Sequence, residues 1–297
     1  MTAFRLMKGE SEDEGVRRLA HECAEDAVKL LRDESGDPIE AVHEARKDLK
    51  KLRATLKLVR PILGEDTYRR ENRRFRDAGR ALSDVRDAQV RAETVDSLAE
   101  RFADDPPQGG WRTARALLVG DGAADNEGLE SLRDAAASAV ERGDEAIDGW
   151  PLDGAGFELL RPGFKRAYSR GRKGYRRARA DPSDEALHEW RKRCKDLWYQ
   201  MRLIRRGWPE VIETTAEEAH ELSDGLGDDH DLVVLIAHFD EADEPLTAEQ
   251  LGHLRRVVEE RRRELQQEAF AYGERLFAER PKRFVKRLES YWEGIRL

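Results

Sequence analysis

The sequence HEARKDLKKL at residues 43–52 recurs as HEWRKRCKDL at residues 188–197. Both copies keep the pattern His-Glu-x-Arg-Lys-x-x-Lys, and they lie 145 residues apart. A second pair of blocks, LSDVRD at 82–87 and LGDDHD at 226–231, keeps nearly the same spacing of 144 residues. Two matches at one spacing indicate duplication of a whole structural unit.

The composition around these copies predicts an all-α fold. Apolar residues make up 39% of the chain and charged residues another 39%, which favours amphipathic surface helices. Proline, glycine and capping residues predict helices at 11–33, 37–60, 65–82, 84–102, 111–119 and 127–147, then at 157–180, 181–206, 209–226, 229–239, 247–280 and 281–292. A hinge at 150–156 would divide the chain into halves 1–148 and 149–297, although its 297 residues also fit one large domain.

Helical phase, at about 100° per residue, gives each copy a cationic face and an apolar face. The cationic face carries His43, Arg46, Lys47, Lys50, Arg53 and Lys57 in the first copy, and His188, Arg191, Lys192, Lys195 and Arg202 in the second. The apolar face carries Leu49, Leu52, Leu56 and Val59 in the first copy, and Trp190, Cys194, Leu197 and Met201 in the second. Each helix is therefore expected to bury one face and present cations on the other.

Two further helices carry basic stripes at i, i+4, i+7 and i+11. They are Arg69, Arg73, Arg76 and Arg80 on one helix, and Arg166, Arg170, Lys173 and Arg177 on the other. The net charge is −8, yet the window 43–80 carries +7 and the window 161–206 carries +11, which leaves −26 elsewhere. Parallel rows of like charge repel each other unless an anion lies between them, so this distribution predicts an anion site.

Each stripe also has a plainer interpretation. Charged stripes are usually solvated helix faces, and Glu44, Asp48 and Glu71 could neutralise part of the charge through pairs along the helix. His43 and His188 could donate to phosphate oxygens or could be partly buried structural residues. Four stripes together with a duplicated motif favour the anion site.

In combination and order, these motifs resemble the CHAD family, the conserved histidine α-helical domain. The resemblance rests on the paired His-Glu-x-Arg-Lys-x-x-Lys helices, the two downstream blocks, the basic segment 168–175 and a terminal Arg-Phe-x-Lys-Arg-x-x-x-x-Trp at 283–292. It implies two four-helix-type bundles related by a pseudo-twofold axis around a basic channel. It also implies binding of inorganic polyphosphate and association with polyphosphate granules.

The resemblance assigns binding to His43, Arg46, Lys47, Lys50 and Arg53 in one half, and to His188, Arg191, Lys192 and Lys195 in the other. His230, in the second downstream block, completes the predicted phosphate-binding set. The copies differ at two positions, since Trp198 stands in place of Arg53 and Asp196 in place of Lys51. Relatives often adjoin a triphosphate-processing CYTH domain, but no strand-rich segment or Glu-x-Glu-x-Lys signature occurs here, so a non-catalytic binding module is expected.

Two other functions remain open. A metal-dependent phosphohydrolase could use His188, His230 and Asp231, although both copies lack the second histidine of a His-Glu-x-x-His zinc helix, and Asp228 and Asp229 suggest a helix N-cap. Nucleic acid is less favoured, because helical phase turns most of the aromatic residues near the basic segments toward the core. The aromatics in question are Tyr168, Tyr175 and Tyr199.

The remaining sequence features predict the setting of the protein. Residues 1–10 contain no apolar run with a cleavage site, and no run of eighteen apolar residues occurs, so a cytoplasmic protein without membrane contact is expected. Cys23 and Cys194 lie in separate helical segments and are expected to be buried thiols. We predict no cofactor and no bound metal.

Overall fold

The computed structural model describes residues 4–82, 84–106, 110–119, 126–152, 154, 156–241 and 246–294. All regular structure within these ranges is helical, so the predicted all-α class is confirmed. Ser83 and the side chains of residues 84–89 lie outside the description, so the block LSDVRD is described only in part. Parts of the predicted loop 103–110, interruption 120–126 and hinge 150–156 also lie outside it.

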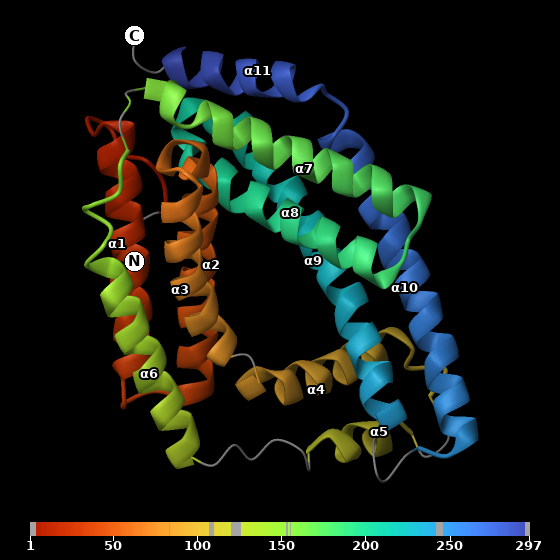
Figure 1. The fold of residues 1–297 in the computed structure, drawn as a ribbon. Helices are drawn as coiled ribbons and strands as arrows, with labels where there is room; N and C mark the ends of the chain where they lie inside the picture. Colours follow the sequence, from red (N-terminus) through yellow and green to blue (C-terminus); the bar gives the residue numbers. More distant parts are fainter. Residues whose placement is uncertain are drawn as a thin grey trace.

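Eleven α-helices and two short 3-10 helices make up the described part of the chain (Figure 1). The first half contains α1 (Glu12–Arg32), α2 (Pro38–Leu63), α3 (Glu65–Ala81), α4 (Asp84–Arg101), α5 (Gly110–Val119) and α6 (Asn126–Asp144). The second half contains η1 (Gly156–Leu159), α7 (Arg161–Ala180), α8 (Asp184–Leu203), η2 (Arg205–Gly207), α9 (Pro209–Glu241), α10 (Ala248–Leu276) and α11 (Pro281–Gly294).

Helices α1 and α2 begin where their capping residues predict. Ser11 and Glu14 form a reciprocal capping box at the start of α1, in which the Glu14 carboxylate accepts from the Ser11 amide at 3.0 Å. The Asp37 carboxylate accepts from the amide of Ile39 at 2.9 Å, and Pro38 occupies the first turn of α2. Both side chains satisfy amides that have no partner within the helix.

Two predicted helix ends are wrong. Helix α2 continues through Pro61 to Leu63, and this costs little because a proline near the end of a helix removes only one backbone hydrogen bond. Helix α9 runs without a break through the block LGDDHD, where a turn was expected. Asp229 is therefore no N-cap residue: it is buried within α9 and accepts from Arg262 and Gln266 of α10 at 2.9 and 2.8 Å.

The helices pack as two groups of four (Figure 1). Helix α1 contacts α2 and α6, and α3 contacts the same two helices, which closes the first group. In the second group α8 contacts α7 and α9, and α10 contacts the same two helices. Helix α2 also contacts α7 and α8, so the groups meet along these helices. A pseudo-twofold relation between the groups stays a prediction.

Two apolar cores hold these groups together, and each core contains residues from both halves of the chain. The larger core joins residues from both halves, from Leu6 to Trp292. The smaller core packs α4 and α5, through residues such as Leu98 and Leu118, against α9 and α10. Helices α4 and α5 lie at the bottom of Figure 1, where α4 also contacts α2. The division at 148 and 149 stays a prediction.

A buried carboxylate links the two ends of the chain. Glu12, in the first turn of α1, is 2% exposed and accepts from the Gly156 amide at 2.7 Å and from the Trp292 indole at 2.8 Å. These bonds connect α1 to η1 and to α11. Since a buried carboxylate is costly without partners, both bonds stabilise this arrangement.

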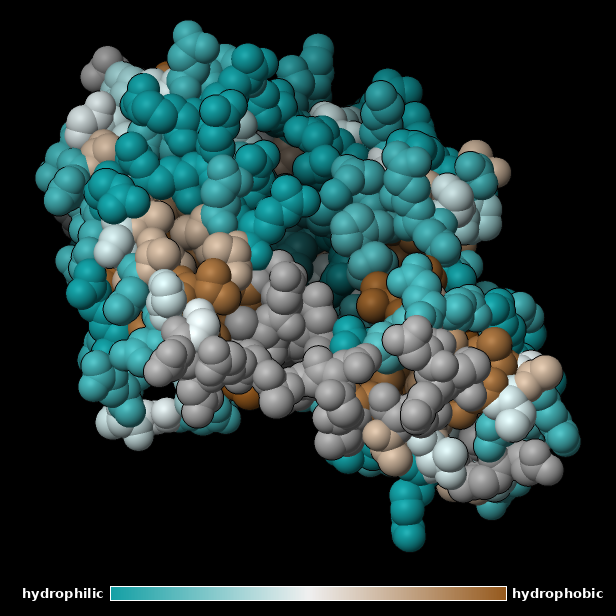
Figure 2. Space-filling view, turned by 60° about the horizontal axis from the view of Figure 1, so that its bottom comes forward, coloured by the Kyte–Doolittle hydropathy of each residue, from teal (hydrophilic) through white to brown (hydrophobic). Residues whose placement is uncertain are grey.

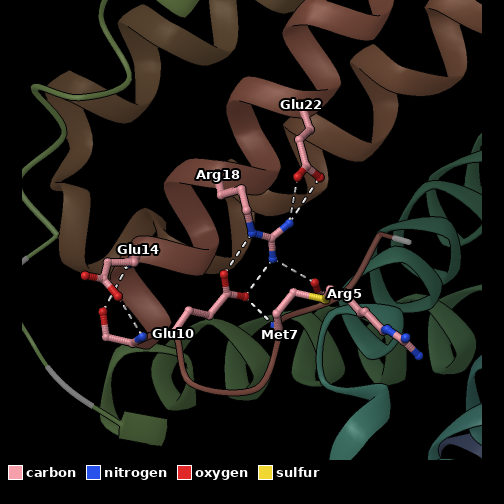
Figure 3. A network of polar contacts seen from close by, with 7 residues as sticks. Arg5, Met7, Glu10, Glu14, Arg18 and Glu22 are labelled. Carbon is pink, nitrogen blue, oxygen red and sulfur yellow. Dashed lines mark hydrogen bonds and ion pairs between the residues drawn. The ribbon is translucent and has the colours of Figure 1, made fainter. Parts of the chain in front are cut away.

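The segment before α1 is held by Arg18 (Figure 3). The Arg18 guanidinium donates to Glu10 at 2.8 Å, to Glu22 at 3.0 Å and to the carbonyl of Arg5 at 3.0 Å. The amide of Leu6 donates to the carbonyl of Leu203, at the end of α8, at 2.9 Å. The N-terminal segment is therefore attached both to α1 and to the second half.

Within the described residues, no helix combines the length and the apolar character needed to cross a membrane. Cys23 and Cys194 are both free and buried, as predicted.

Candidate functional site

A groove of about 530 Å³ lies where α2, α3, α7 and α8 meet. Its described lining consists of Lys50, Arg53, Lys57, Arg60, Tyr68, Asn72, Arg76, Arg170, His188, Arg191, Lys192, Arg193, Lys195, Asp196 and Tyr199. Ten of these side chains are lysine or arginine, and Asp196 is the only carboxylate among them. Figure 2 shows a face of the molecule that is hollowed near its centre, with hydrophilic residues along the upper side of the hollow. The groove is therefore strongly cationic.

Helix α2 supplies four cations to this groove from one face. Lys50, Arg53, Lys57 and Arg60 follow each other at i, i+3, i+7 and i+10, a spacing that places side chains on one side of a helix. The opposite side is apolar and buried, as predicted: it comprises Leu49, Leu52, Leu56 and Val59. Burial of these residues fixes the rotation of α2 and turns its cations to the groove.

Helix α8 presents the second copy of the motif in the same way. His188, Arg191, Lys192 and Lys195 all line the groove. The predicted apolar face is confirmed, because Trp190, Cys194, Leu197 and Met201 are fully buried. The Arg191 guanidinium lies against Gly227 of α9, where a Cβ atom would come within 2.8 Å of its Nη2. Gly227 thus leaves room for Arg191.

Lys50, Lys57 and Lys195 of the groove have lowered pKa values. Burial in the groove, followed by repulsion from Lys195, Arg46 and Arg191, lowers the pKa of Lys50 to about 7. Burial also lowers the pKa of Lys195. Asp224 raises this pKa in part, and repulsion from Arg191 lowers it further. Lys50 still reaches solvent, so an anion entering the groove would relieve this repulsion directly.

Two arginines of the groove, Arg53 and Arg170, also have lowered pKa values. Burial lowers the pKa of Arg53, and burial together with repulsion from Arg193 and Arg166 lowers that of Arg170. Asp196 opposes both shifts, and it accepts from Lys57 at 2.5 Å while Arg193 lies 3.7 Å away. Several other cations of the groove pair with carboxylates outside its lining, such as Arg60 with Glu65 and Lys195 with Asp224. Among the described residues, Lys50, Arg53, Arg170 and Arg191 line the groove without an ion pair, and such an excess of unpaired positive charge is typical of an anion-binding site.

Eleven of the twenty predicted site residues lie outside the lining of this groove. Arg166 lines a narrow pocket that adjoins it. The other predicted residues outside the groove are His43, Arg46, Lys47, Arg69, Arg73, Arg80, Lys173, Arg177, Arg202 and His230. The basic stripes on α3 and α7 therefore reach the groove only through Arg76 and Arg170.

Several of these outlying residues have contacts of their own. The Arg46 guanidinium donates to the carbonyl of Leu82 at the end of α3, at 3.3 Å, and Lys47 forms an ion pair with Glu44. The Arg202 guanidinium lies over the ring of Trp198, 5.3 Å from its centre. These contacts give Arg46 and Arg202 structural roles in the unliganded protein.

The residues of the alternative hydrolase site do not line one pocket. The rings of His188 and His230 are in contact, with centres 4.3 Å apart, and burial and then His230 lower the pKa of His188 to about 4. Asp231 instead lines a separate pocket between α4, α9 and α10. In the part of the chain that the structure describes, no group of three or more His, Cys, Asp or Glu side chains could hold a metal ion.

The aromatic residues near the basic helices mostly face the core, as predicted. Tyr168 is fully buried and stacks on Phe284 with ring centres 3.9 Å apart, and Tyr175 packs against Trp190. Tyr199 is also buried, although it borders the groove. These rings are not free platforms on which nucleobases could stack.

The sequence reasoning missed Arg60 and Arg193. Arg60 was passed over because α2 was expected to end there, yet the spacing from Lys50 and Lys57 places it on the same helix face. Arg193 lies off the cationic face of α8, and its long side chain reaches Glu189 at 2.9 Å and the groove. The place of Arg60 could therefore be predicted from the helical periodicity, whereas that of Arg193 depends on the length of its side chain.

Comparisons with known proteins agree with this architecture. The structure of PptA from Streptomyces chartreusis is similar, with a TM-score of 0.60 and 16% sequence identity over 91% of this chain and 100% of that chain. This likeness concerns the fold. No curated protein matches the chain. The family model of the CHAD domain matches residues 17–240, which is most of the chain. The protein therefore belongs to the CHAD family.

Proposed function

We propose that this protein binds inorganic polyphosphate along the groove between α2, α3, α7 and α8, without cleaving it. The observation that carries the proposal is the lining of ten lysine and arginine side chains against one carboxylate. The CHAD membership supports the same ligand. A linear polymer of phosphates supplies a negative charge at every unit, so it can contact these cations together.

The energetics of the groove favour a polyanion over a single small anion. Each phosphate contact to a lysine or arginine releases condensed counterions, so affinity grows with the number of contacts and falls with salt. Linked phosphates also bind as one multivalent ligand, which raises the affinity of a long chain above that of its parts. Polymer binding of this kind suits a protein attached to polyphosphate granules, and we include that association in the proposal.

The test is a titration of the protein with long-chain polyphosphate and with triphosphate over a series of salt concentrations. We expect long chains to bind more tightly, with an affinity that falls steeply as salt rises. Affinity that is indifferent to both chain length and salt would refute the proposal.

Two parallel assays address the other functions. Release of inorganic phosphate from polyphosphate in the presence of Mg²⁺, Mn²⁺ or Zn²⁺ would show a hydrolase and contradict the non-catalytic part of the proposal. Displacement of bound polyphosphate by RNA or DNA of matched charge would show a general polyanion groove. We expect no release, and displacement only at a large excess of nucleic acid.

A further inference from the structure

The groove has a narrow end that differs from the rest of it. A pocket of about 40 Å³ adjoins the wide section of about 530 Å³ and shares with it a boundary that contains Asp196. The residues that the two spaces share are Lys57, Arg60, Tyr68, Arg170, Arg193 and Asp196, and the narrow pocket adds Arg166, Ala167 and Gln200. Such a volume holds a few water molecules, which is room for one phosphate group.

Close helix contacts surround this narrow end. Gly163 of α7 packs so tightly on α2 that a Cβ atom there would come within 1.7 Å of the carbonyl oxygen of Leu58. The side chain of Gln200 on α8 donates to the carbonyl of Ala54 on α2 at 3.0 Å. Both contacts hold α7 and α8 directly against α2 here. The groove therefore narrows here to a space that fits a single phosphate group.

The narrow end combines cations with two hydrogen-bond acceptors. Five cations line it: Lys57, Arg60, Arg166, Arg170 and Arg193. The first acceptor is the carboxylate of Asp196. The second is the amide oxygen of Gln200, which is buried and has no hydrogen-bond partner among the described residues. A fully ionised phosphate offers only acceptors and would face repulsion from the Asp196 carboxylate.

A phosphate that keeps one proton fits these acceptors better. Its P–OH group can donate to Asp196, while its other oxygens accept from the surrounding cations. Phosphate monoesters lose their second proton near pH 6, and the terminal unit of a polyphosphate chain carries an ionisation of this kind. Internal units are joined on both sides and have no proton to offer near neutral pH.

We propose that the narrow end is a chain-end subsite, which binds the terminal phosphate of polyphosphate in its singly protonated form. This inference rests on the proposed function and adds a direction to it: the polymer enters the wide section with its end at Asp196. Asp196 then acts as a specificity-determining residue, because it admits a group with a proton and repels one without.

The test compares two polymers of equal length, one with free terminal phosphates and one with both ends blocked as alkyl esters. At pH 6 we expect the free-ended polymer to bind about tenfold more tightly, the effect of one hydrogen bond to a charged group. This preference should shrink toward pH 8 as the terminal proton is lost. If the free ends bound more tightly only because of their extra negative charge, the preference would instead grow as the pH rises. That result would overturn the inference.

The pH series has to distinguish the titration of the terminal phosphate of the polymer from the titration of groups on the protein. The charged or titratable groups that border Asp196 and the narrow end are Arg53, Lys57 and Arg60 on α2, Tyr68 on α3, Arg166 and Arg170 on α7, and Arg193 on α8. The blocked polymer meets the same groups, so the ratio of the two affinities cancels their contribution. The ratio is therefore the quantity to follow.

The variant Asp196→Asn assigns the effect to its residue. It removes the charge and supplies an N–H group, so we expect the preference for free ends to disappear while the blocked polymer binds more tightly. The matched control is Asp224→Asn, which removes an equal charge from a residue that pairs with Lys195 but does not line the groove. The control should keep the preference.

Melting curves establish that each variant is folded. Should Asp196→Asn fail to fold, Arg166→Gln replaces it: Arg166 is exposed and lines only the narrow end, and its loss should reduce the preference for free ends. A folded variant that retains the full preference would contradict the subsite. If the wild-type protein binds neither polymer, the proposed function itself fails, whereas equal binding of both refutes the chain-end subsite alone.

Discussion

The two copies of the repeated motif share a sequence pattern but present different residues to the groove. In the second copy, on α8, all four predicted positions from His188 to Lys195 line the groove. Of the four matching positions in the first copy, on α2, only Lys50 does so. Lys47 pairs with Glu44 just as Lys192 pairs with Glu189, so one local ion pair is common to both copies. A duplicated sequence therefore does not guarantee a duplicated site.

The difference arises from the neighbours of each helix. On the second helix, Arg191 rests against Gly227 of a continuous α9 and faces the groove. On the first helix, Arg46 donates to the carbonyl of Leu82 at the end of α3. At one further position the first copy has Lys51, which pairs with Asp48, and the second has Asp196, which enters the groove. The first half extends its contribution through Arg53, Lys57 and Arg60 instead.

The largest expected effect concerns the contact between the two halves. In Gly163→Ala, the new Cβ would collide with the Leu58 carbonyl, and a backbone atom cannot move aside cheaply. We expect a loss of about 3 kcal/mol in the free energy of unfolding, measured by urea denaturation. Gly128→Ala in α6 is the control, because nothing lies within 4 Å of that position, and it should change stability by at most about 1 kcal/mol. Equal stability of the two variants would show that α7 does not press on α2.

The next effect compares the copies directly. Replacing Arg191 and Lys192 together with alanine removes two cations from the groove and should weaken polyphosphate binding about 100-fold, since each charge-assisted contact contributes about 1.4 kcal/mol. Replacing Arg46 and Lys47 removes the same residue types from the first copy and should cost less than about fivefold. Binding curves at one salt concentration decide this. Equal losses would show that both copies contact the polymer.

The smallest expected effect is a pH dependence of the affinity for polyphosphate, caused by the titration of Lys50 in the first half of the chain. The pKa of Lys50 is about 7 in the free protein, and a bound anion raises it because it favours the charged form. Affinity should therefore be constant below pH 7 and fall above it, by at most about tenfold per pH unit from this group. Calorimetry in buffers of different ionisation enthalpy should show proton uptake on binding at pH 8.

The control for this titration is Lys50→Arg, which keeps the positive charge at every pH used. It should flatten the decline above pH 7 and reduce the proton uptake. A variant that leaves both unchanged would show that another group is responsible, with Lys195 the next candidate because its pKa is lowered as well.

The sequence was sufficient to predict the helices and the buried faces of α2 and α8, because apolar periodicity alone sets which side of a helix is buried. It was insufficient at Pro61 and at Gly227-Asp228, where tertiary packing overrides the local signals. Asp229 illustrates this. The residues before it predict a helix break, but its hydrogen bonds with Arg262 and Gln266 stabilise a continuous helix.

The basic stripes were the least reliable part of the site prediction. A stripe defines a direction around one helix, but whether it meets other helices depends on their placement. Of the basic stripe on α3, only Arg76 reaches the groove, whereas Arg69 pairs with Glu65 and Arg73 is exposed. On α7 Lys173 is exposed beyond the groove. Conversely, Asp196 belongs to the site although its charge is opposite to that of the motif.

The central claim is that the groove, not the overall charge of the protein, binds the polymer. The most direct measurement is the affinity for long-chain polyphosphate of Lys50→Glu combined with Lys195→Glu, against Arg112→Glu combined with Arg263→Glu. Both pairs change the net charge equally, and the second pair is exposed on α5 and α10, outside the groove. We predict a loss of at least about 100-fold and a shallower salt dependence for the groove pair, with a change of only a few-fold for the other pair. Equal losses in both would contradict the claim.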